Sequence, residues 1–180
     1  AITLGGALSA GTLAGTTGVT VNAVANGIGN GFNQSGYAIS SSAGGVTITV
    51  NSQAGGIAYN SSGAITATGQ AITINTTTTT GIGINDTGAI TGGVVTITAT
   101  QTTAAATATP VTVTGLITAN SVTITGNGGA ASTIVSLGAV TINAGGGNLT
   151  VTANNVAAGG TTGITQTGAI TDNAVGGNLI

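Results

Sequence analysis

The chain has 180 residues, contains no Lys, Arg, His, Cys, Met or Trp, and carries two acidic residues, Asp86 and Asp172, so its formal net charge is -2. General acid–base catalysis needs a group that titrates near the working pH, and a nucleophilic Ser or Thr needs a partner base, so this composition argues against an enzyme. Zinc and calcium sites need Cys, His or several carboxylates, and phosphate binding needs cations. We therefore expect no metal, no cofactor and no nucleic-acid partner.

A short signature, made of a small polar residue, Gly, an apolar residue and Thr, returns seven times along the chain. Its glycines follow one another at intervals of 23 to 30 residues, and they are Gly11, Gly36, Gly63, Gly88, Gly115, Gly138 and Gly168. The best-preserved copies span 62–66, 87–91 and 167–171. Self-similarity with a period of about 26 residues is typical of architectures in which each repeat stacks on the next.

The predicted elements are strands throughout. In chain order, the first is the opening stretch 1–4; after it, one strand precedes each signature glycine and another is the Ala-Ile-Thr piece that follows the glycine. The clearest strands alternate aliphatic residues with Thr, and they span 46–50, 72–74, 95–98, 122–125 and 149–152. A period of two indicates a strand with one buried face. The 34 glycines and the lack of a 3.6-residue period disfavour helix.

Alignment on the signature glycine places an apolar residue at the same position of successive repeats. We predict that these residues form one core column, namely Phe32, Tyr59, Ile84, Val111, Ile134 and Ile164. Directly after three of them come Asn33, Asn60 and Asn85, which we predict to form an Asn ladder at a bend, with amides bonding to the coils above and below. Asp86 and Asp172 occupy different positions of the repeat, and we predict both to be solvated turn residues.

These patterns predict an all-β fold: a right-handed parallel β-solenoid of about seven coils, with about 26 residues and three short strands per coil. We expect residues 1–180 to form one solenoid domain without evident caps. Uncapped coils expose strand edges and invite head-to-tail stacking into an open filament. The predicted assembly ends are Ala1, Ile2, Thr3, Leu4, Asn178, Leu179 and Ile180. No strongly apolar run of about 18 residues or more occurs, so we predict no transmembrane segment.

The stretches 147–153 (Gly-Asn-Leu-Thr-Val-Thr-Ala) and 163–171 (Gly-Ile-Thr-Gln-Thr-Gly-Ala-Ile-Thr) resemble the filamentous-haemagglutinin-like and β-strand-repeat proteins of bacterial surfaces. The resemblance is compositional and covers the whole chain. It implies a right-handed β-helix in long extracellular fibres that serve adhesion, biofilm matrix or cell contact, with no catalytic residues. We therefore expect a structural filament subunit at the cell surface, whose partners are copies of itself and, at its sides, surface glycans or neighbouring cells.

Two other functions fit parts of the pattern. The outward pairs Thr47/Thr49, Thr96/Thr98, Thr123/Thr125 and Thr150/Thr152, with Asn22, Asn75 and Asn143 in the second place of other coils, resemble the Thr arrays of ice-binding solenoids. The other alternative is a β-sandwich pilin joined by donor-strand exchange, in which an extended terminus completes the neighbour's sheet. Asn33, Asn60 and Asn85 also lie in Asn-X-Ser/Thr sequons and are the candidate glycosylation sites.

Overall fold

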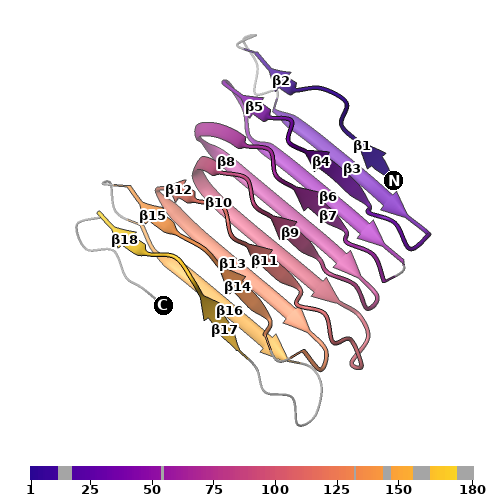
Figure 1. Cartoon of the computed structure of the whole chain (residues 1–180). Coiled ribbons are helices and arrows are strands. Elements are labelled where there is room, and N and C mark those ends of the chain that lie inside the picture. The colour runs from indigo at the N-terminus through magenta and orange to yellow at the C-terminus, as the bar shows by residue number, and fades with distance from the viewer. Residues whose placement is uncertain (12–17, 54, 132, 144–146, 156–162, 174–180) are drawn as a thin grey trace.

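The computed structural model describes residues 1–11, 18–53, 55–131, 133–143, 147–155 and 163–173. Within these ranges the chain is all β, with 18 strands and no helix. All the strand pairs are parallel, and they join elements about one repeat apart in sequence. The strands therefore stack into a β-solenoid of about six turns (Figure 1). This confirms the prediction of an all-β solenoid built from stacked parallel strands.

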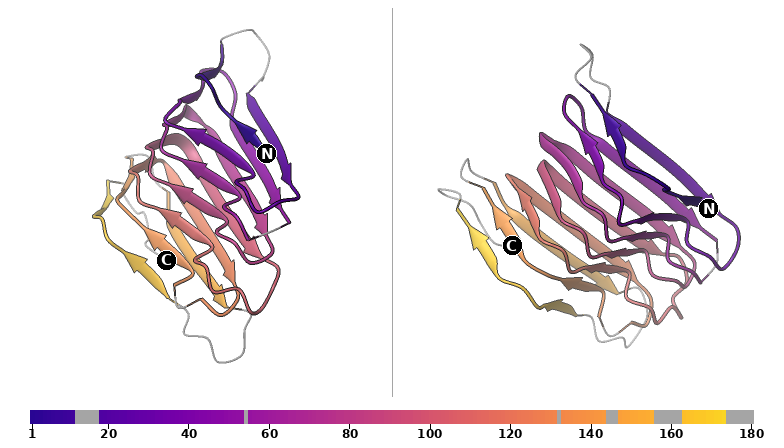
Figure 2. Two further views of the ribbon diagram at one scale, coloured as in Figure 1. Left: turned by 45° about the vertical axis from the view of Figure 1, so that its right-hand side comes forward. Right: turned by 45° about the horizontal axis from the view of Figure 1, so that its top comes forward.

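The strands lie in three rows that run along the stack (Figures 1 and 2). Row A is the seven-stranded sheet of β1 (Ile2–Thr3), β4 (Phe32–Ser35), β7 (Tyr59–Ser61), β9 (Ile84–Asp86), β11 (Val111–Val113), β14 (Val135–Leu137) and β17 (Ile164–Gln166). Row B contains β2 (Leu8–Ala10), β5 (Ile39–Ser41), the first halves of β8 (Ile65–Thr78) and β10 (Ile90–Gln101), β12 (Ile117–Ala119), β15 (Val140–Ile142) and β18 (Ile170–Asp172). Row C contains β3 (Val19–Ala25), β6 (Val46–Ser52), the second halves of β8 and β10, β13 (Ser121–Gly128) and β16 (Leu149–Asn155).

Each coil thus has three strand positions, but rows B and C merge in the middle of the stack. In β8 a single strand continues through the bend, where Gly69 adopts a positive φ of 73°. Glycine suits this left-handed conformation because it has no Cβ. The neighbouring β10 follows the same bend with a register shift between Gly92 and Val94.

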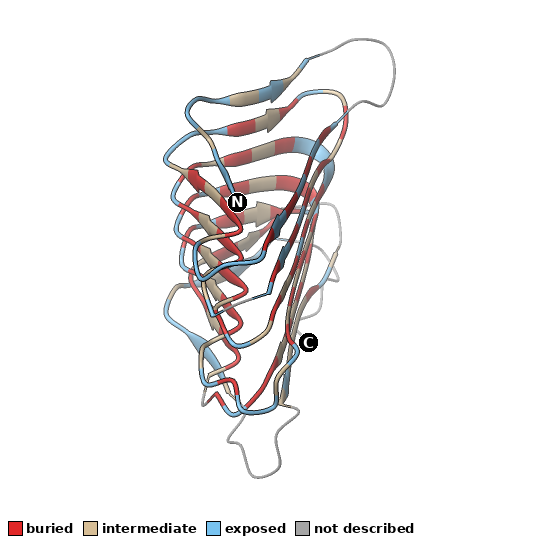
Figure 3. Cartoon of the chain, turned by 90° about the vertical axis from the view of Figure 1, so that its right-hand side faces the viewer, coloured by how far each residue is buried: buried red, intermediate tan, exposed pale blue. Residues whose placement is uncertain are grey.

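The alternation of aliphatic residues with Thr produces the core directly. In β13 the burial pattern alternates between intermediate and buried residues over eight positions, so Val122 and Ile124 point inward while Thr123 and Thr125 point outward. Figure 3 shows the same alternation along the stack. The Ile, Val and Ala side chains of all three rows meet in one continuous core. Each inward residue lies over its partner in the next coil, so the apolar side chains are fully buried only when the coils stack.

The signature glycines mark a corner where consecutive coils touch through their backbones. A Cβ placed on Gly115 would collide with the carbonyl group of Gly88, and one placed on Gly88 would collide with that of Gly63. Gly138 departs from this stack, because its Cβ position faces Thr114 instead of Gly115. The coil that contains Gly138 is therefore offset at this corner by one residue.

This offset corrects one predicted core position. The residue that pairs with Val111 and Ile164 is Val135, not Ile134. Ile134 is also fully buried, but it lies just before β14, where its carbonyl accepts a hydrogen bond from the Val111 amide over 3.2 Å. Alignment on the glycine placed the column one residue too early because this coil is one residue shorter between β14 and Gly138.

Candidate assembly surfaces and ladders

The predicted core column lies in row A. Phe32, Tyr59, Ile84 and Val111 are directly paired from coil to coil and have no exposed surface. The rings of Phe32 and Tyr59 stack with their centroids 5.6 Å apart and an angle of 24° between their planes. At the end of the column, Ile164 pairs with Val135 yet is 49% exposed, because no described strand covers β17.

The three predicted ladder asparagines are joined by side-chain hydrogen bonds in the structure. The amide of Asn85 donates to Asn60 Oδ1 over 2.8 Å, and the amide of Asn60 donates to Asn33 Oδ1 over 3.2 Å. The Asn33 oxygen also accepts from the amide of Ser35 over 3.3 Å, at a bulge where Ser35 has a positive φ of 52°. Because Asn60 and Asn85 use their nitrogens in the ladder, attachment of a glycan at these atoms would break it.

Two further Asn ladders escaped the sequence interpretation. Asn154 donates to Asn127 Oδ1 over 2.8 Å, and Asn127 donates to the Thr100 hydroxyl over 3.2 Å. Asn143 donates to Asn120 Oδ1 over 3.5 Å. Both Asn pairs are one repeat apart in sequence, so their spacing was a usable signal. Asn143 consequently belongs to this ladder at the end of row B and not to the Thr array.

Asp86 is buried in the core, which overturns its prediction as a solvated turn residue. It lies at an inward position of row A, paired with Ser61 on one side and Val113 on the other, and it has no exposed surface. Its Oδ1 accepts from the Gly88 amide over 3.0 Å, whereas Oδ2 has no hydrogen-bond partner. Asp86 lies two residues after Ile84, so the strand period of two places both side chains on the same inward face. The prediction of a solvated turn residue did not use this signal.

The surroundings of Asp86 favour its neutral form. Burial raises the pKa of this carboxyl from its ordinary value of 3.8 to about 7, although the Gly88 amide and the neighbouring Ser61 hydroxyl oppose the rise. Burial and the charge of Asp86 also raise the pKa of the Tyr59 phenol above its usual range. Tyr59 donates to Gln34 Oε1, and the Gln34 amide donates to the carbonyls of Tyr37 and Ala64. These groups form a polar layer inside the solenoid.

A second buried amide closes the corner between rows C and A. Gln101 donates to the carbonyls of Gly81 and Ala108 over 3.0 and 2.6 Å, and it accepts from the Gly129 amide over 3.1 Å. Two residues of the Thr run at 76–80 contribute to the same interior, because Thr76 and Thr78 are buried within β8. The hydroxyl of Thr78 donates to the Gly81 carbonyl over 3.0 Å.

The described strands at the two ends of the stack are paired on one side only. Among the described strands, β1, β2 and β3 pair only with β4, β5 and β6, and β17 and β18 pair only with β14 and β15. Of the predicted assembly residues, Ile2 is 38% exposed, Ala1 and Thr3 are exposed, and Leu4 is half-buried. The predictions for Asn178, Leu179 and Ile180 lie outside the described residues.

The outer face of row C carries a regular array of hydroxyls. One column consists of directly paired threonines, Thr20, Thr47, Thr73, Thr96, Thr123 and Thr150. The column two residues further along each strand contains Asn22, Thr49, Asn75, Thr98, Thr125 and Thr152. The described coils therefore give two outward columns, one of Thr alone and one of Thr and Asn.

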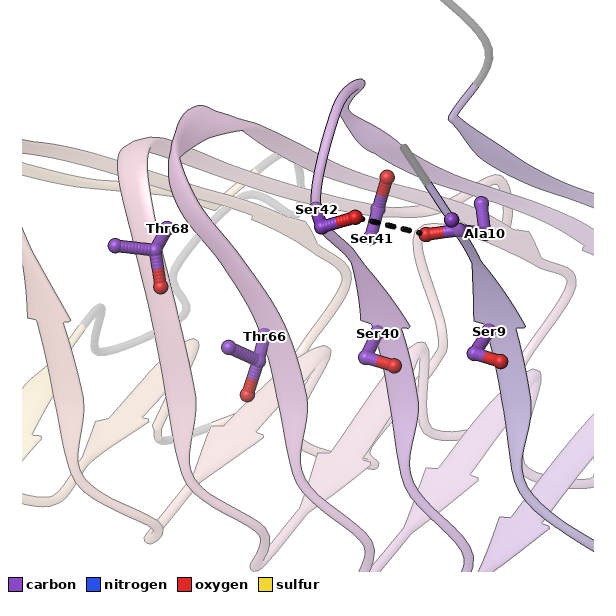
Figure 4. A pocket seen from close by; sticks show the side chains of 8 residues that line it. Ser9, Ala10, Ser40, Ser41, Ser42, Thr66 and Thr68 are labelled. Atoms are coloured by element: carbon purple, nitrogen blue, oxygen red, sulfur yellow. Dashed lines mark hydrogen bonds between the residues drawn. The ribbon is translucent and has the colours of Figure 1, made fainter. Parts of the chain in front are cut away.

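The outer face of row B is hollowed beside β2, β5 and β8 into a groove of about 460 Å³. Figure 4 shows Ser9, Ser40 and Thr66 on neighbouring strands with their hydroxyls on the same side. The Ser42 hydroxyl donates to the Ala10 carbonyl over 3.5 Å. The described residues that line the groove are Ser, Thr, Ala and Gly, so they offer hydrogen bonds but no acid or base.

No family model, curated protein or solved structure matches this chain. Across the described residues, no helix is long and apolar enough to span a membrane. The same residues contain no group of three or more His, Cys, Asp or Glu side chains that could hold a metal ion. The fold places the chain in the class of repeat proteins built as β-solenoids.

Proposed function

We propose that this chain is a structural subunit of an extracellular filament, assembled by head-to-tail stacking of β-solenoid coils. The observation that carries the proposal is that, among the described strands, those at both ends of the stack pair on one side only and leave the row A core column uncovered in the same register. Filaments of this kind would serve adhesion, biofilm matrix or cell-surface scaffolding, with surface glycans or neighbouring cells as partners at their sides. In this proposal the solenoid is right-handed and has seven coils of about 26 residues.

The two ends match in chemistry as well as in shape. Ile2 and Thr3 begin the row A columns that Ile164 and Thr165 continue at the other end, through the successive pairs of β4, β7, β9, β11 and β14. A second copy placed with β1 on β17 and β2 on β18 would therefore extend these two row A columns with the kind of residue that they already contain. Rows A and B pair in this way at the coil boundaries within the described chain, so docking repeats an existing contact in these two rows.

The edges also supply hydrogen-bonding groups. Between coils, parallel strands use alternate amides and carbonyls, as in the bonds from Ile2 N to Gly31 O and from Thr167 N to Leu137 O. The groups that face outward on the end strands have no strand to bond within the described chain. Open edges of this kind bind further strands readily. A net charge of -2 provides little repulsion between copies.

The test is cryo-electron microscopy and pelleting of native material and of two Lys variants. Ile164→Lys places a charge on the open edge of row A and should abolish fibres, because charged edges oppose strand addition. Thr49→Lys, on the exposed outer face of β6 in mid-stack, is the matched control and should leave fibres intact. Particles that stay monomeric in all preparations would refute the proposal. If the last coil of one copy continues covalently into the first coil of the next, the fibre is a longer protein and not a stack of subunits. If a neighbour's terminal strand completes the sheet, the fibre forms by donor-strand exchange instead of stacking.

A second candidate is ice binding, favoured by the paired threonines of row C. Neighbouring parallel strands lie about 4.8 Å apart, so the array presents hydroxyls at a regular spacing over the described coils. Thr49→Lys interrupts the array and should abolish thermal hysteresis, while Ile164→Lys should leave it unchanged. The same two variants thus have opposite expected effects under the two functions, and wild-type protein without thermal hysteresis would remove this candidate.

A further inference from the structure

Three asparagines of the chain are followed directly by glycine, and they are Asn26, Asn30 and Asn127. The side-chain carbon of an Asn can be attacked by the backbone nitrogen of the next residue. Glycine favours this reaction, because it has no Cβ to hinder the approach and it adopts the widest range of backbone angles. In a folded chain the reaction therefore depends on whether the Asn side chain and the glycine amide are free to meet.

Asn26 lies at the corner between rows C and A, directly after β3, where the chain is open to water. Residues 26–29 are all exposed. Among the hydrogen bonds of the described residues, none involves the Asn26 side chain or the Gly27 amide. A Cβ placed on Gly27 would meet nothing within 4 Å, and a hollow of about 100 Å³ lies beside both residues. Asn26 and Gly27 therefore have room to bring the reacting atoms together.

At Asn30 the fold holds the glycine amide in place. Gly31 is buried, and its amide donates to the Ile57 carbonyl over 3.0 Å. The Gly31 carbonyl accepts from the Ile2 amide over 2.8 Å, so this residue is bonded on both sides. The Gly31 amide must leave its hydrogen bond before it can attack the Asn30 side chain, and this need for local opening slows the reaction.

At Asn127 the fold holds both reacting groups. Asn127 and Gly128 belong to β13, which lies between β10 and β16. The Asn127 side chain donates to the Thr100 hydroxyl over 3.2 Å and accepts from Asn154 over 2.8 Å. Gly128 is buried. Reaction at this site would require the ladder to open and the strand to separate from its neighbours.

We propose that Asn26 is a site of spontaneous deamidation, at which the folded chain converts Asn to Asp and isoaspartate. The Gly27 nitrogen attacks Cγ of Asn26, and the new N–Cγ bond closes a five-membered succinimide ring. The Cγ–Nδ2 bond breaks, and ammonia leaves with the proton of the Gly27 amide. Water then opens the ring. Opening at Cγ gives Asp at position 26, whereas opening at the backbone carbonyl gives isoaspartate, in which the main chain passes through the former side chain.

The modification changes the charge of the chain without disturbing its core. One more carboxylate changes the net charge from -2 to -3. The new charge lies at an exposed corner, where it stays hydrated and is inexpensive to the fold. Isoaspartate lengthens the main chain by one carbon, and the exposed residues 26–29 can absorb this change before the chain is bonded again at Gly31. We therefore expect the modified protein to stay folded and to accumulate with age.

The experiment incubates the whole folded chain in mildly alkaline buffer, which favours loss of the proton from the attacking nitrogen. A protease that cleaves before Asp cuts the unmodified chain before Asp86 and Asp172 alone. Asp at position 26, 30 or 127 adds a cut at that position, and mass spectrometry measures each new fragment. Isoaspartate carries the same added mass but is not cut, so fragmentation in the mass spectrometer locates it.

We expect conversion at Asn26 to be at least about tenfold faster than at Asn30 or Asn127 in the folded chain, because only the latter two must first break hydrogen bonds. In concentrated urea the three sites should react at similar rates. Gly27→Val is the matched variant: its side chain enters open space, so the fold should be kept while the reaction at Asn26 slows and the other two sites are unchanged. Circular dichroism verifies the fold before and after incubation.

Equal rates at the three sites of the folded chain, or a slower reaction at Asn26 than at either other site, would refute the inference. An unchanged rate at Asn26 in Gly27→Val would refute it as well. If the preference for Asn26 persists undiminished in urea, the local sequence selects the site and the structural argument fails.

Discussion

The buried carboxyl of Asp86 predicts that this protein is more stable in mild acid than at neutral pH. Its pKa is about 7 in the folded chain, against an ordinary value of 3.8 that we take for the unfolded chain. Because the folded pKa is the higher one, the folded state holds the proton more tightly. The stabilisation is complete below about pH 4, declines as the pH rises, and is lost above about pH 7.

The size of the effect follows from the same two values. A difference between 3.8 and about 7 corresponds to about 4 kcal/mol of stability at most. Few other groups contribute, because the chain has one further Asp, two Tyr and no Lys, Arg or His. The free energy of unfolding of the wild type should thus fall by up to about 4 kcal/mol between about pH 4 and about pH 7.5.

The assay is urea denaturation followed by circular dichroism, in an Ile164→Lys background, which under the proposed function is expected to keep the protein monomeric. Asp86→Asn keeps the oxygen that accepts from the Gly88 amide but cannot ionise, so its stability should not vary with pH over this range. Asp86→Val, which copies the next residue of the column, Val113, should behave in the same way. A wild-type stability that stays flat or rises toward neutral pH, or a slope that persists in both variants, would contradict the burial argument.

Three further predictions concern the inter-coil contacts and use urea midpoints at about pH 5. Gly115→Ala should destabilise the fold by about 1–3 kcal/mol or more, since its Cβ meets backbone, whereas Gly27→Ala, with nothing within 4 Å, should be neutral. Gln101→Leu should cost at least about 2 kcal/mol by removing the side-chain hydrogen bonds of the Ala108 carbonyl and the Gly129 amide and one of the two that the Gly81 carbonyl accepts, and exposed Gln70→Ala should not. Asn60→Ala should cost about 1–2 kcal/mol through two lost ladder bonds.

The sequence by itself determined the period, the strand type and the inward face of most strands. Alternation of Ile or Val with Thr, as in β13, leaves a strand only one way to bury its apolar side. The repeated spacing then placed Asn33, Asn60 and Asn85 where their amides bond across coils. These features depend on local chemistry that recurs in every copy, so comparison of one copy with another was enough to find them.

The tertiary structure decided where each coil turns and what lies inside. Val135 rather than Ile134 joins the core column because one coil is shorter by a residue, and the backbone absorbs that difference at a corner. Gln101 is buried, against the expectation for a polar residue, because Gly81 and Gly129 of the neighbouring coils supply backbone partners outside its own repeat. Asp86 bonds to Gly88 two residues away and is buried because Ser61 and Val113 of the adjacent coils pair with it on both sides. The residues that enclose an inward polar group belong to other coils, so only the assembled stack fixes its burial and its pKa.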